Sequence, residues 1–207
     1  MAVTEERARN FLLAGVGGQG TLLAADVVAR VGLELGWDVK KSEIHGMAQR
    51  GGSVTSQVRW GRQVYSPLIE PGQVDYMVAF ERLEALRYAA MLRPGGALLI
   101  NDYRIAPVSA TFGDAVYPDD AAERAAYAGQ VQRLFYLPAM ELAAAVGNAR
   151  ANNVVMLGAL SALLPDVAEE AWLEVIAQRV PPRSLAANQA AFRCGRAALR
   201  GPTEAGR

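Results

Sequence analysis

The chain has 207 residues, of which 52% are hydrophobic and 20% are charged, and its 21 basic side chains balance its 21 acidic ones. A zero net charge argues against a nucleic-acid-binding protein, which usually carries a basic surface. One Cys and one His exclude an internal disulfide, a Cys-based zinc site and an iron–sulfur cluster held by this chain alone, because such a cluster takes four thiolates.

The chain alternates short apolar runs with segments of helical periodicity. Strands are expected at residues 10–14, 37–44, 53–60, 75–80, 97–101 and 133–137, with a short one within 107–117. Helices are expected at residues 21–35, 81–92, 119–129, 138–146, 153–164, 168–179 and 184–199. A return strand at Val64–Tyr65 would form a β-hairpin with the strand at 53–60.

This alternation predicts a single α/β domain over residues 1–200, with a Rossmann-like, mostly parallel sheet, a β-hairpin and a helical C-terminal third. Residues 201–207 are expected to form a disordered tail. No apolar run approaches the roughly 20 residues of a membrane span, and residues 1–9 do not resemble a signal peptide. Together with the lone Cys194, these features predict a cytoplasmic protein.

The first Gly-rich segment, Gly15-Val16-Gly17-Gly18-Gln19-Gly20, follows a strand and opens a helix. Glycines in this context permit a tight turn and let backbone amides at the helix N-terminus approach an anion. A dinucleotide site would add an acidic residue about 20 positions on, where Glu43 stands. A free-standing NAD(P)-dependent Rossmann enzyme is therefore one hypothesis, and a purely structural turn is the alternative.

Two further cofactor motifs are weaker. Residues 92–100 resemble a turn and strand of S-adenosylmethionine-dependent methyltransferases, yet the run 11–14 lacks the acidic residue that usually precedes the first glycines in those enzymes. The segment 113–115 lacks the third Gly of a thiamine diphosphate motif and lies too far from Asn152-Asn153. We expect no thiamine diphosphate site in this chain alone and no metal ligands.

A second loop, at residues 45–53, is the stronger candidate for a functional site. It holds the lone His, a Gln, an Arg and three Gly within nine residues. Backbone amides, a cation and an imidazole together suit an anionic group or a polar partner surface. The loop reads His45-Gly46-Met47-Ala48-Gln49-Arg50-Gly51-Gly52-Ser53. His45 and Arg50 are the catalytic candidates, and Arg50 is favoured for a carboxylate or other anion because its planar fork suits that task.

These pieces resemble the gamma-type subunits of 2-oxoacid:ferredoxin oxidoreductases, most strongly those acting on indolepyruvate. The resemblance runs from about residue 10 to residue 198. It is carried by both Gly-rich loops and by three segments: Tyr65-Ser66-Pro67-Leu68-Ile69, Phe80-Glu81-Arg82-Leu83-Glu84-Ala85-Leu86-Arg87-Tyr88 and Asn153-Val154-Val155-Met156-Leu157-Gly158, with a closing pattern over 188–195.

The resemblance implies that the chain is a subunit that carries no cofactor of its own. The whole complex would use thiamine diphosphate with Mg, 4Fe-4S clusters and coenzyme A (CoA) to decarboxylate a 2-oxoacid oxidatively, giving acyl-CoA and carbon dioxide. A larger thiamine- and iron–sulfur-binding subunit would be the partner, and ferredoxin or another acceptor would take the electrons. An arylpyruvate such as indolepyruvate is favoured, and phenylglyoxylate and branched-chain 2-oxoacids are the alternatives.

The resemblance also implies contacts with the partner, with CoA or with a substrate channel. The residues expected to make them are Gly17, Gly18, Gln19, Gly20, Gly46, Gln49, Gly51, Gly52, Ser53 and Asn153. Three aromatic residues, Trp60, Phe80 and Tyr88, could line a substrate pocket, but core packing is the favoured interpretation for each.

Overall fold

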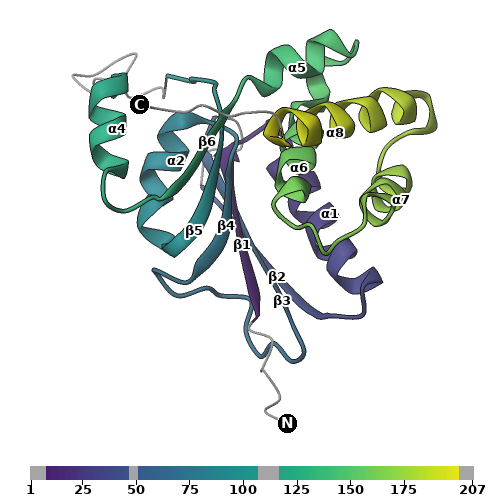
Figure 1. Cartoon of the computed structure of the whole chain (residues 1–207), viewed down its shortest axis with the longest axis horizontal. Coiled ribbons are helices and arrows are strands. Elements are labelled where there is room, and N and C mark those ends of the chain that lie inside the picture. The colour runs from purple at the N-terminus through teal and green to yellow at the C-terminus, as the bar shows by residue number, and fades with distance from the viewer. Residues whose placement is uncertain (1–7, 47–50, 107–116, 201–207) are drawn as a thin grey trace.

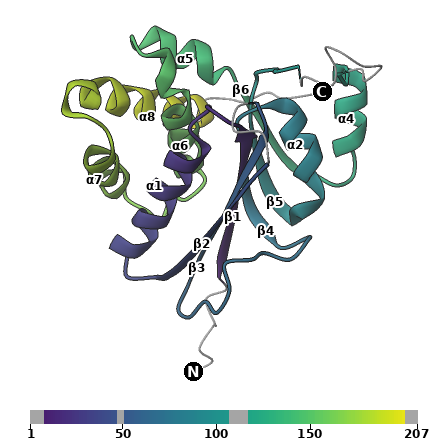
Figure 2. The ribbon, with the colours of Figure 1, turned by 180° about the vertical axis from the view of Figure 1, so that it is seen from behind.

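A six-stranded sheet with helices on both faces organises the computed structural model, which describes residues 8–46, 51–106 and 117–200 (Figures 1 and 2). The strands are β1 (Arg9–Val16), β2 (Asp38–His45), β3 (Ser53–Gly61), β4 (Val74–Ala79), β5 (Leu92–Asn101) and β6 (Arg133–Leu137). The helices are α1 (Thr21–Glu34), α2 (Arg82–Tyr88), α4 (Asp120–Tyr127), α5 (Ala139–Ala145), α6 (Asn152–Ala162), α7 (Glu169–Arg179) and α8 (Leu185–Arg200). The expected short strand within 107–117 and the expected tail at 201–207 lie, but for Tyr117, outside the described residues.

The sheet is mostly parallel, as predicted, with the strand order β2-β3-β1-β4-β5-β6. β1, β4, β5 and β6 pair in parallel. β3 runs antiparallel to both of its neighbours, β1 and β2. The predicted β-α-β unit of β1, α1 and β2 therefore encloses an inserted strand, and its two strands are not neighbours.

The structure contains a β-hairpin, but not the predicted one, since Val64–Tyr65 forms no return strand for β3. β3 pairs instead with β2, through the loop at residues 46–52. The Val64 N–H donates to the Oδ2 of Asp38 at 2.7 Å. The chain then continues through Pro67 and Pro71, which have no N–H to donate to a strand ladder.

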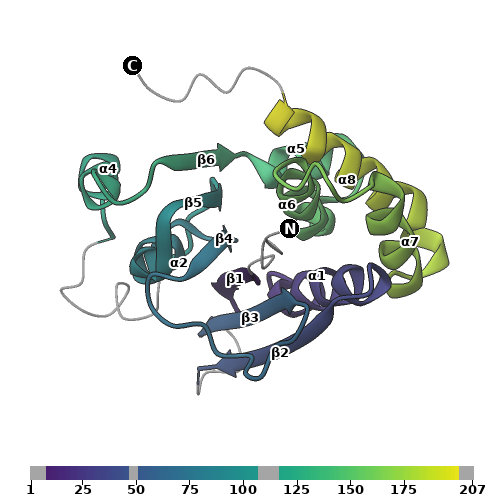
Figure 3. The same cartoon turned by 60° about the horizontal axis from the view of Figure 1, so that its bottom comes forward.

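Alternating side chains of the strands build two cores on opposite faces of the sheet. Figure 3 shows α2 on one side of the sheet and α1 with α5 to α8 on the other. Phe11 and Leu13 face the larger core, beneath α1 and α5 to α8. Leu12 and Ala14 face the smaller core, beneath α2 and α4. Trp60 is 1% exposed and lies with its ring centroid 4.6 Å from that of Phe11, so it belongs to the core, as favoured from the sequence.

The C-terminal third is helical, as predicted, and α6 and α8 pack with their backbones in close contact. A Cβ on Gly158 would lie 1.9 Å from the carbonyl oxygen of Phe192, and one on Gly195 would lie 1.9 Å from that of Val155. The two glycines thus permit an approach that any side chain would prevent. Within the described ranges, no helix has both the length and the apolar character needed to cross a membrane.

Candidate functional site

The two Gly-rich loops meet at the end of the sheet where β1 and β4 present their carboxyl ends. α1 follows β1 onto one face of the sheet, and α2 follows β4 onto the other (Figure 1). Open α/β sheets bind ligands in the crevice that such a divergence leaves between two neighbouring strands. The glycines of the first loop and the end of the second loop, Gly51 to Ser53, line cavities at this crevice. Asn153 lies beneath it.

The side chain of Gln19 shapes the first loop. Its Oε1 accepts from the Val16 N–H at 2.7 Å, and its Nε2 donates to the Phe80 carbonyl at 2.8 Å. The amide therefore joins the end of β1 to the end of β4. Gln19 holds the loop in place, and the loop presents its backbone to the crevice.

Asn153 supports the same loop from below. It lies in the first turn of α6 and is 4% exposed, and its Nδ2 lies 3.4 Å from the Gly20 carbonyl oxygen. Gly20 adopts φ +80°, and a Cβ there would lie 2.4 Å from Nδ2 of Asn153. Both the backbone conformation and the close approach require glycine at this position.

The N-terminus of α1 opens into a cavity of about 410 Å³ lined by Gly17, Gly18, Gly20 and Thr21, among others. The N–H groups of a first helical turn have no partners within the helix. α1 has no side-chain cap and no acidic residue in its first turn. The Oγ1 of Thr21, which is 3% exposed, also has no hydrogen-bond partner among the described residues. This end of the helix therefore offers donors to an anion.

The second loop is tied to the first and to α2. The Gly17 N–H donates to the Gly52 carbonyl at 2.9 Å, and the Gly46 N–H donates to the Ser53 carbonyl at 3.0 Å. The Ser53 hydroxyl donates to the Glu84 carboxylate at 2.5 Å and lies 3.2 Å from the Tyr88 hydroxyl. These bonds place the end of the second loop over α2.

A cavity of about 200 Å³ lies between the second loop and the start of α2, and its lining includes Gly52, Ser53, Glu81, Glu84 and Arg87. Glu84 is 3% exposed, and this burial raises the pKa of its carboxyl, against the opposing effects of the Ser53 hydrogen bond and the Arg87 charge. The Nε of Arg87 lies 3.6 Å from Oε1 of Glu84, while half of the Arg87 side chain stays exposed. The cavity thus combines a buried carboxyl, a hydroxyl and an accessible guanidinium.

Gln49 and Arg50 lie outside the described residues, so their predicted contacts stay predictions. The backbone of His45 ends β2 and pairs with Val54. Phe80 is fully buried, as favoured. Tyr88 is partly buried and packs against the smaller core, while its hydroxyl reaches Ser53. Among the described residues, no three His, Cys, Asp or Glu side chains are grouped as metal ligands would be.

Comparison with known proteins decides the family. The model of the pyruvate ferredoxin/flavodoxin oxidoreductase family matches residues 10–198. The chain belongs to this family. It is 39% identical over 189 residues to the indolepyruvate oxidoreductase subunit IorB of Thermococcus kodakarensis, covering 90% of this chain and 93% of that protein. It is 41% identical over 151 residues to the Archaeoglobus fulgidus subunit of the same name, covering 73% and 75% of the two chains.

The fold agrees with the same family. The crystal structure of the gamma subunit of a keto/oxoacid ferredoxin oxidoreductase from Geobacter sulfurreducens superposes with a TM-score of 0.70 at 26% identity. That match covers 93% of this chain and 98% of the other. The resemblance to gamma-type subunits is thereby confirmed, and with it the assignment of the chain to an oxidoreductase as one of its subunits.

The structure also contradicts the dinucleotide hypothesis on geometric grounds. Glu43 lies on β2, at the edge of the sheet, and its carboxylate is 2.9 Å from Lys41 Nζ. Because β3 separates β2 from β1, β2 is not the strand that neighbours the first Gly-rich loop. The acidic residue of a dinucleotide site would need to reach the ribose from that neighbouring strand.

Two polar residues of the site were missed in the sequence. Glu84 and Arg87 lie in a segment that carries the family resemblance, but no role was assigned to either. Their spacing of three places both on one face of α2, and an acidic residue on a short helix beside apolar neighbours was the available signal. The partner that makes Glu84 informative, Ser53, is 31 residues away along the chain.

Proposed function

We propose that this chain is the small subunit of a cytoplasmic 2-oxoacid oxidoreductase that acts on indolepyruvate or another arylpyruvate. The observation that carries the proposal is the match to two subunits named for indolepyruvate, one over 90% of this chain and the other over 73%. The complex would convert the 2-oxoacid and CoA to acyl-CoA and carbon dioxide and pass the electrons to ferredoxin or another acceptor. Phenylglyoxylate or a branched-chain 2-oxoacid is the alternative substrate.

In this proposal, the redox cofactors belong to a larger partner subunit. One Cys in 207 residues does not suffice for a 4Fe-4S cluster, which takes four thiolates. Thiamine diphosphate with Mg would likewise be held by the partner. The contribution of this chain is then to position substrate groups and to complete the assembly.

The first Gly-rich loop is the proposed contact for an anionic part of CoA. Gly18 and Gly20 leave the backbone accessible, and the first turn of α1 supplies N–H donors. These residues fit a phosphate group. When bound, CoA supplies the thiol that accepts the acyl group.

The second loop is the proposed contact for the partner or the substrate channel. Arg50 would bind a carboxylate, and His45, Gln49 and the neighbouring glycines would line the same passage. Arg87 is a second cation at this crevice, on the opposite wall from the loop. Arg50 and Arg87 at one opening would together favour an anionic substrate such as a 2-oxoacid.

The test is reconstitution of the complex from this chain and the larger subunit of its enzyme, with turnover followed for indolepyruvate, phenylglyoxylate and a branched-chain 2-oxoacid. We expect CoA-dependent turnover only with both subunits present, and fastest with indolepyruvate. Arg50→Ala should lower kcat/KM roughly 10- to 100-fold, since it removes a charge-assisted hydrogen bond. Arg62→Ala, at an exposed position on the β3–β4 connection, is the matched control.

Full activity of either subunit alone would contradict the proposal. An unchanged kcat/KM for Arg50→Ala in an intact complex would assign the second loop a purely structural role.

A further inference from the structure

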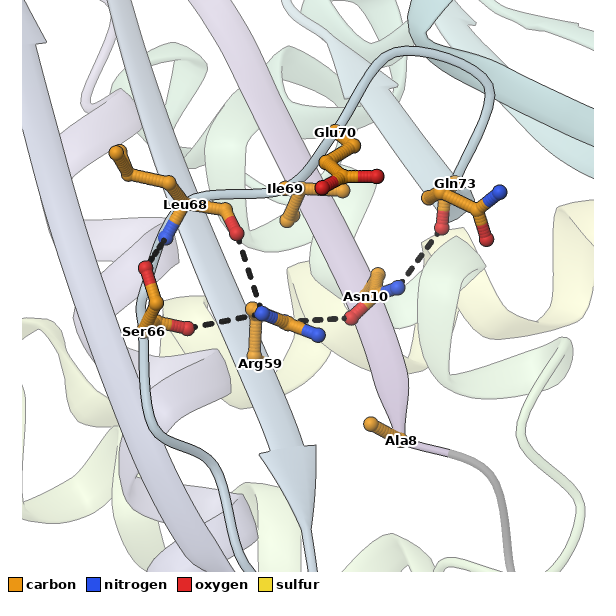
Figure 4. A pocket seen from close by; sticks show the side chains of 8 residues that line it. All are labelled: Ala8, Asn10, Arg59, Ser66, Leu68, Ile69, Glu70 and Gln73. Carbon is orange, nitrogen blue, oxygen red and sulfur yellow. Dashed lines mark hydrogen bonds between the residues drawn. The ribbon is translucent and has the colours of Figure 1, made fainter.

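A third cavity, larger than the two at the crevice, lies at the opposite end of β1 from the Gly-rich loops. Its volume is about 600 Å³, and it opens beside the starts of β1 and β4 and the chain that leaves β3 (Figure 4). β1 has eight residues, so roughly 23 Å separates its two ends. This cavity is therefore a separate site from the crevice.

The floor of this cavity is the guanidinium of Arg59, on β3. Its Nε donates to Asn10 Oδ1 at 3.0 Å, and its Nη1 donates to the carbonyls of Ser66 at 3.0 Å and Leu68 at 3.1 Å. All three acceptors are neutral. Among the described residues, no carboxylate lies within ion-pair distance of Arg59, so its positive charge is not compensated there.

These bonds leave the second terminal nitrogen of Arg59, Nη2, as a donor for a group in the cavity. Figure 4 shows this nitrogen turned away from Ser66 and Leu68. Asn10 cannot turn away, because its own Nδ2 donates to the Gln73 carbonyl at 2.8 Å. The guanidinium is thus fixed in place before anything binds, which favours a planar anion such as a carboxylate.

An apolar rim adjoins this charge. Tyr65 is 85% exposed and Leu68 is 57% exposed. The segment that carries them is anchored, because the Ile69 N–H donates to Gln57 Oε1 at 2.6 Å and Ile69 itself is buried. A rigid segment that holds large apolar side chains in solvent is typical of a protein interface.

We propose that Arg59, Tyr65 and Leu68 form a docking surface for a segment of the larger subunit that carries one carboxylate, from an acidic side chain or a chain terminus. The carboxylate binds Arg59, and neighbouring apolar residues cover Tyr65 and Leu68. A free carboxylate ion would leave this rim exposed. Glu70 also lines the cavity, so its charge disfavours a doubly charged phosphate. The inference rests on the proposed function, which supplies the larger subunit.

The first test measures the dissociation constant of the reconstituted complex for a matched pair of variants. Leu68→Asp and Leu68→Lys remove the same apolar surface, but they place opposite charges beside Arg59. We expect Leu68→Asp to weaken binding roughly tenfold more than Leu68→Lys, because a nearby negative charge competes for Arg59 and repels the partner carboxylate. Circular dichroism checks that both variants fold, and since the side chain of Leu68 is exposed, no core contact is lost.

The second test replaces Tyr65 with a photo-crosslinking amino acid, with Leu33 on α1, which is 57% exposed, as the control position. We expect position 65 to crosslink to a peptide of the larger subunit that contains Asp, Glu or its carboxyl terminus. Arg59→Glu should then abolish docking, and Asp→Arg or Glu→Arg in that peptide should restore it.

Three results would overturn the inference. These are equal binding by both Leu68 variants and the wild type, a crosslink from position 65 to a second copy of this chain, and saturable binding of acetate to Arg59 without a crosslink to the larger subunit. Turnover of the complex is measured separately, so each of these results can occur while the proposed function stands. Failure of the two subunits to assemble at all would instead count against the proposed function.

Discussion

Substitution of Gly20 by Ala tests whether the first Gly-rich loop is held by Asn153. Gly20 and Gly36 flank α1 and have nearly the same backbone angle, with φ +80° and +81°. A Cβ on Gly36 would meet nothing within 4 Å, whereas one on Gly20 would lie 2.4 Å from Asn153 Nδ2. The pair therefore separates the cost of the left-handed conformation from the cost of the contact.

The expected magnitudes follow from these two terms. An L-residue in the left-handed region costs about 1–2 kcal/mol, and Ala returns about 0.4–1 kcal/mol by restricting the unfolded chain. Gly36→Ala should therefore lower the free energy of unfolding by about 1 kcal/mol. Gly20→Ala should lose about 1–3 kcal/mol more, because the buried Asn153 must move and gives up its contact with the Gly20 carbonyl.

Urea unfolding of both variants, followed by circular dichroism, measures the difference. Asn153→Ala provides the internal check, because it removes the obstructing amide. In the double variant, the effects of Gly20→Ala and Asn153→Ala should fail to add by about 1 kcal/mol or more. Equal destabilisation by Gly20→Ala and Gly36→Ala, within about 0.5 kcal/mol, would refute the role assigned to Asn153.

Gly158→Ala should lower the free energy of unfolding by about 2–3 kcal/mol in urea titrations, because its Cβ would lie 1.9 Å from the Phe192 carbonyl oxygen and would force α6 and α8 apart. Glu84→Gln should change the pH dependence of stability. Burial raises the folded pKa of Glu84 above its ordinary value of 4.5, so the carboxyl favours folding below that pH and this contribution is lost as pH rises through the folded pKa. The stability of the wild type relative to Glu84→Gln should therefore fall as pH rises from about 4.5, and a constant difference would contradict the raised pKa. Ser53→Ala should change stability by about 1 kcal/mol and lower turnover of the reconstituted complex, since the second loop loses its bond to Glu84; unchanged turnover would show that this bond does not position the loop.

Most elements of the fold were predictable because their signals are local. Helical spacing of apolar residues marks α1, and the glycines before it mark a turn between strand and helix. The position of β3 was not predictable in this way. Insertion between β1 and β2 depends on pairing between residues that are tens of positions apart, such as Leu12 with Gln57, and no local pattern records that choice.

The same distinction applies to the site. Both Gly-rich loops are visible in the sequence, since each concentrates glycines within a few residues. Glu84 reads as an ordinary polar position of a short helix until Ser53 and the end of the second loop cover it. A buried carboxyl is a property of packing between distant segments, so its raised pKa becomes apparent only in the folded chain.

The chain has few catalytic side chains, and several of its side-chain amides serve to hold the structure near the crevice. Gln19 joins the ends of β1 and β4, and Asn101 joins the end of β4 to the start of α5, through the Phe80 carbonyl at 3.2 Å and the Ala139 N–H at 3.1 Å. Asn153 supports Gly20 from α6. Each of these side chains is satisfied within the protein and fixes a strand end or a loop. What the crevice then presents outward is backbone N–H groups and the Arg87 guanidinium, which can orient an anion but cannot carry electrons. A rigid binding surface of this kind is suited to a subunit that positions a substrate for chemistry performed by its partner.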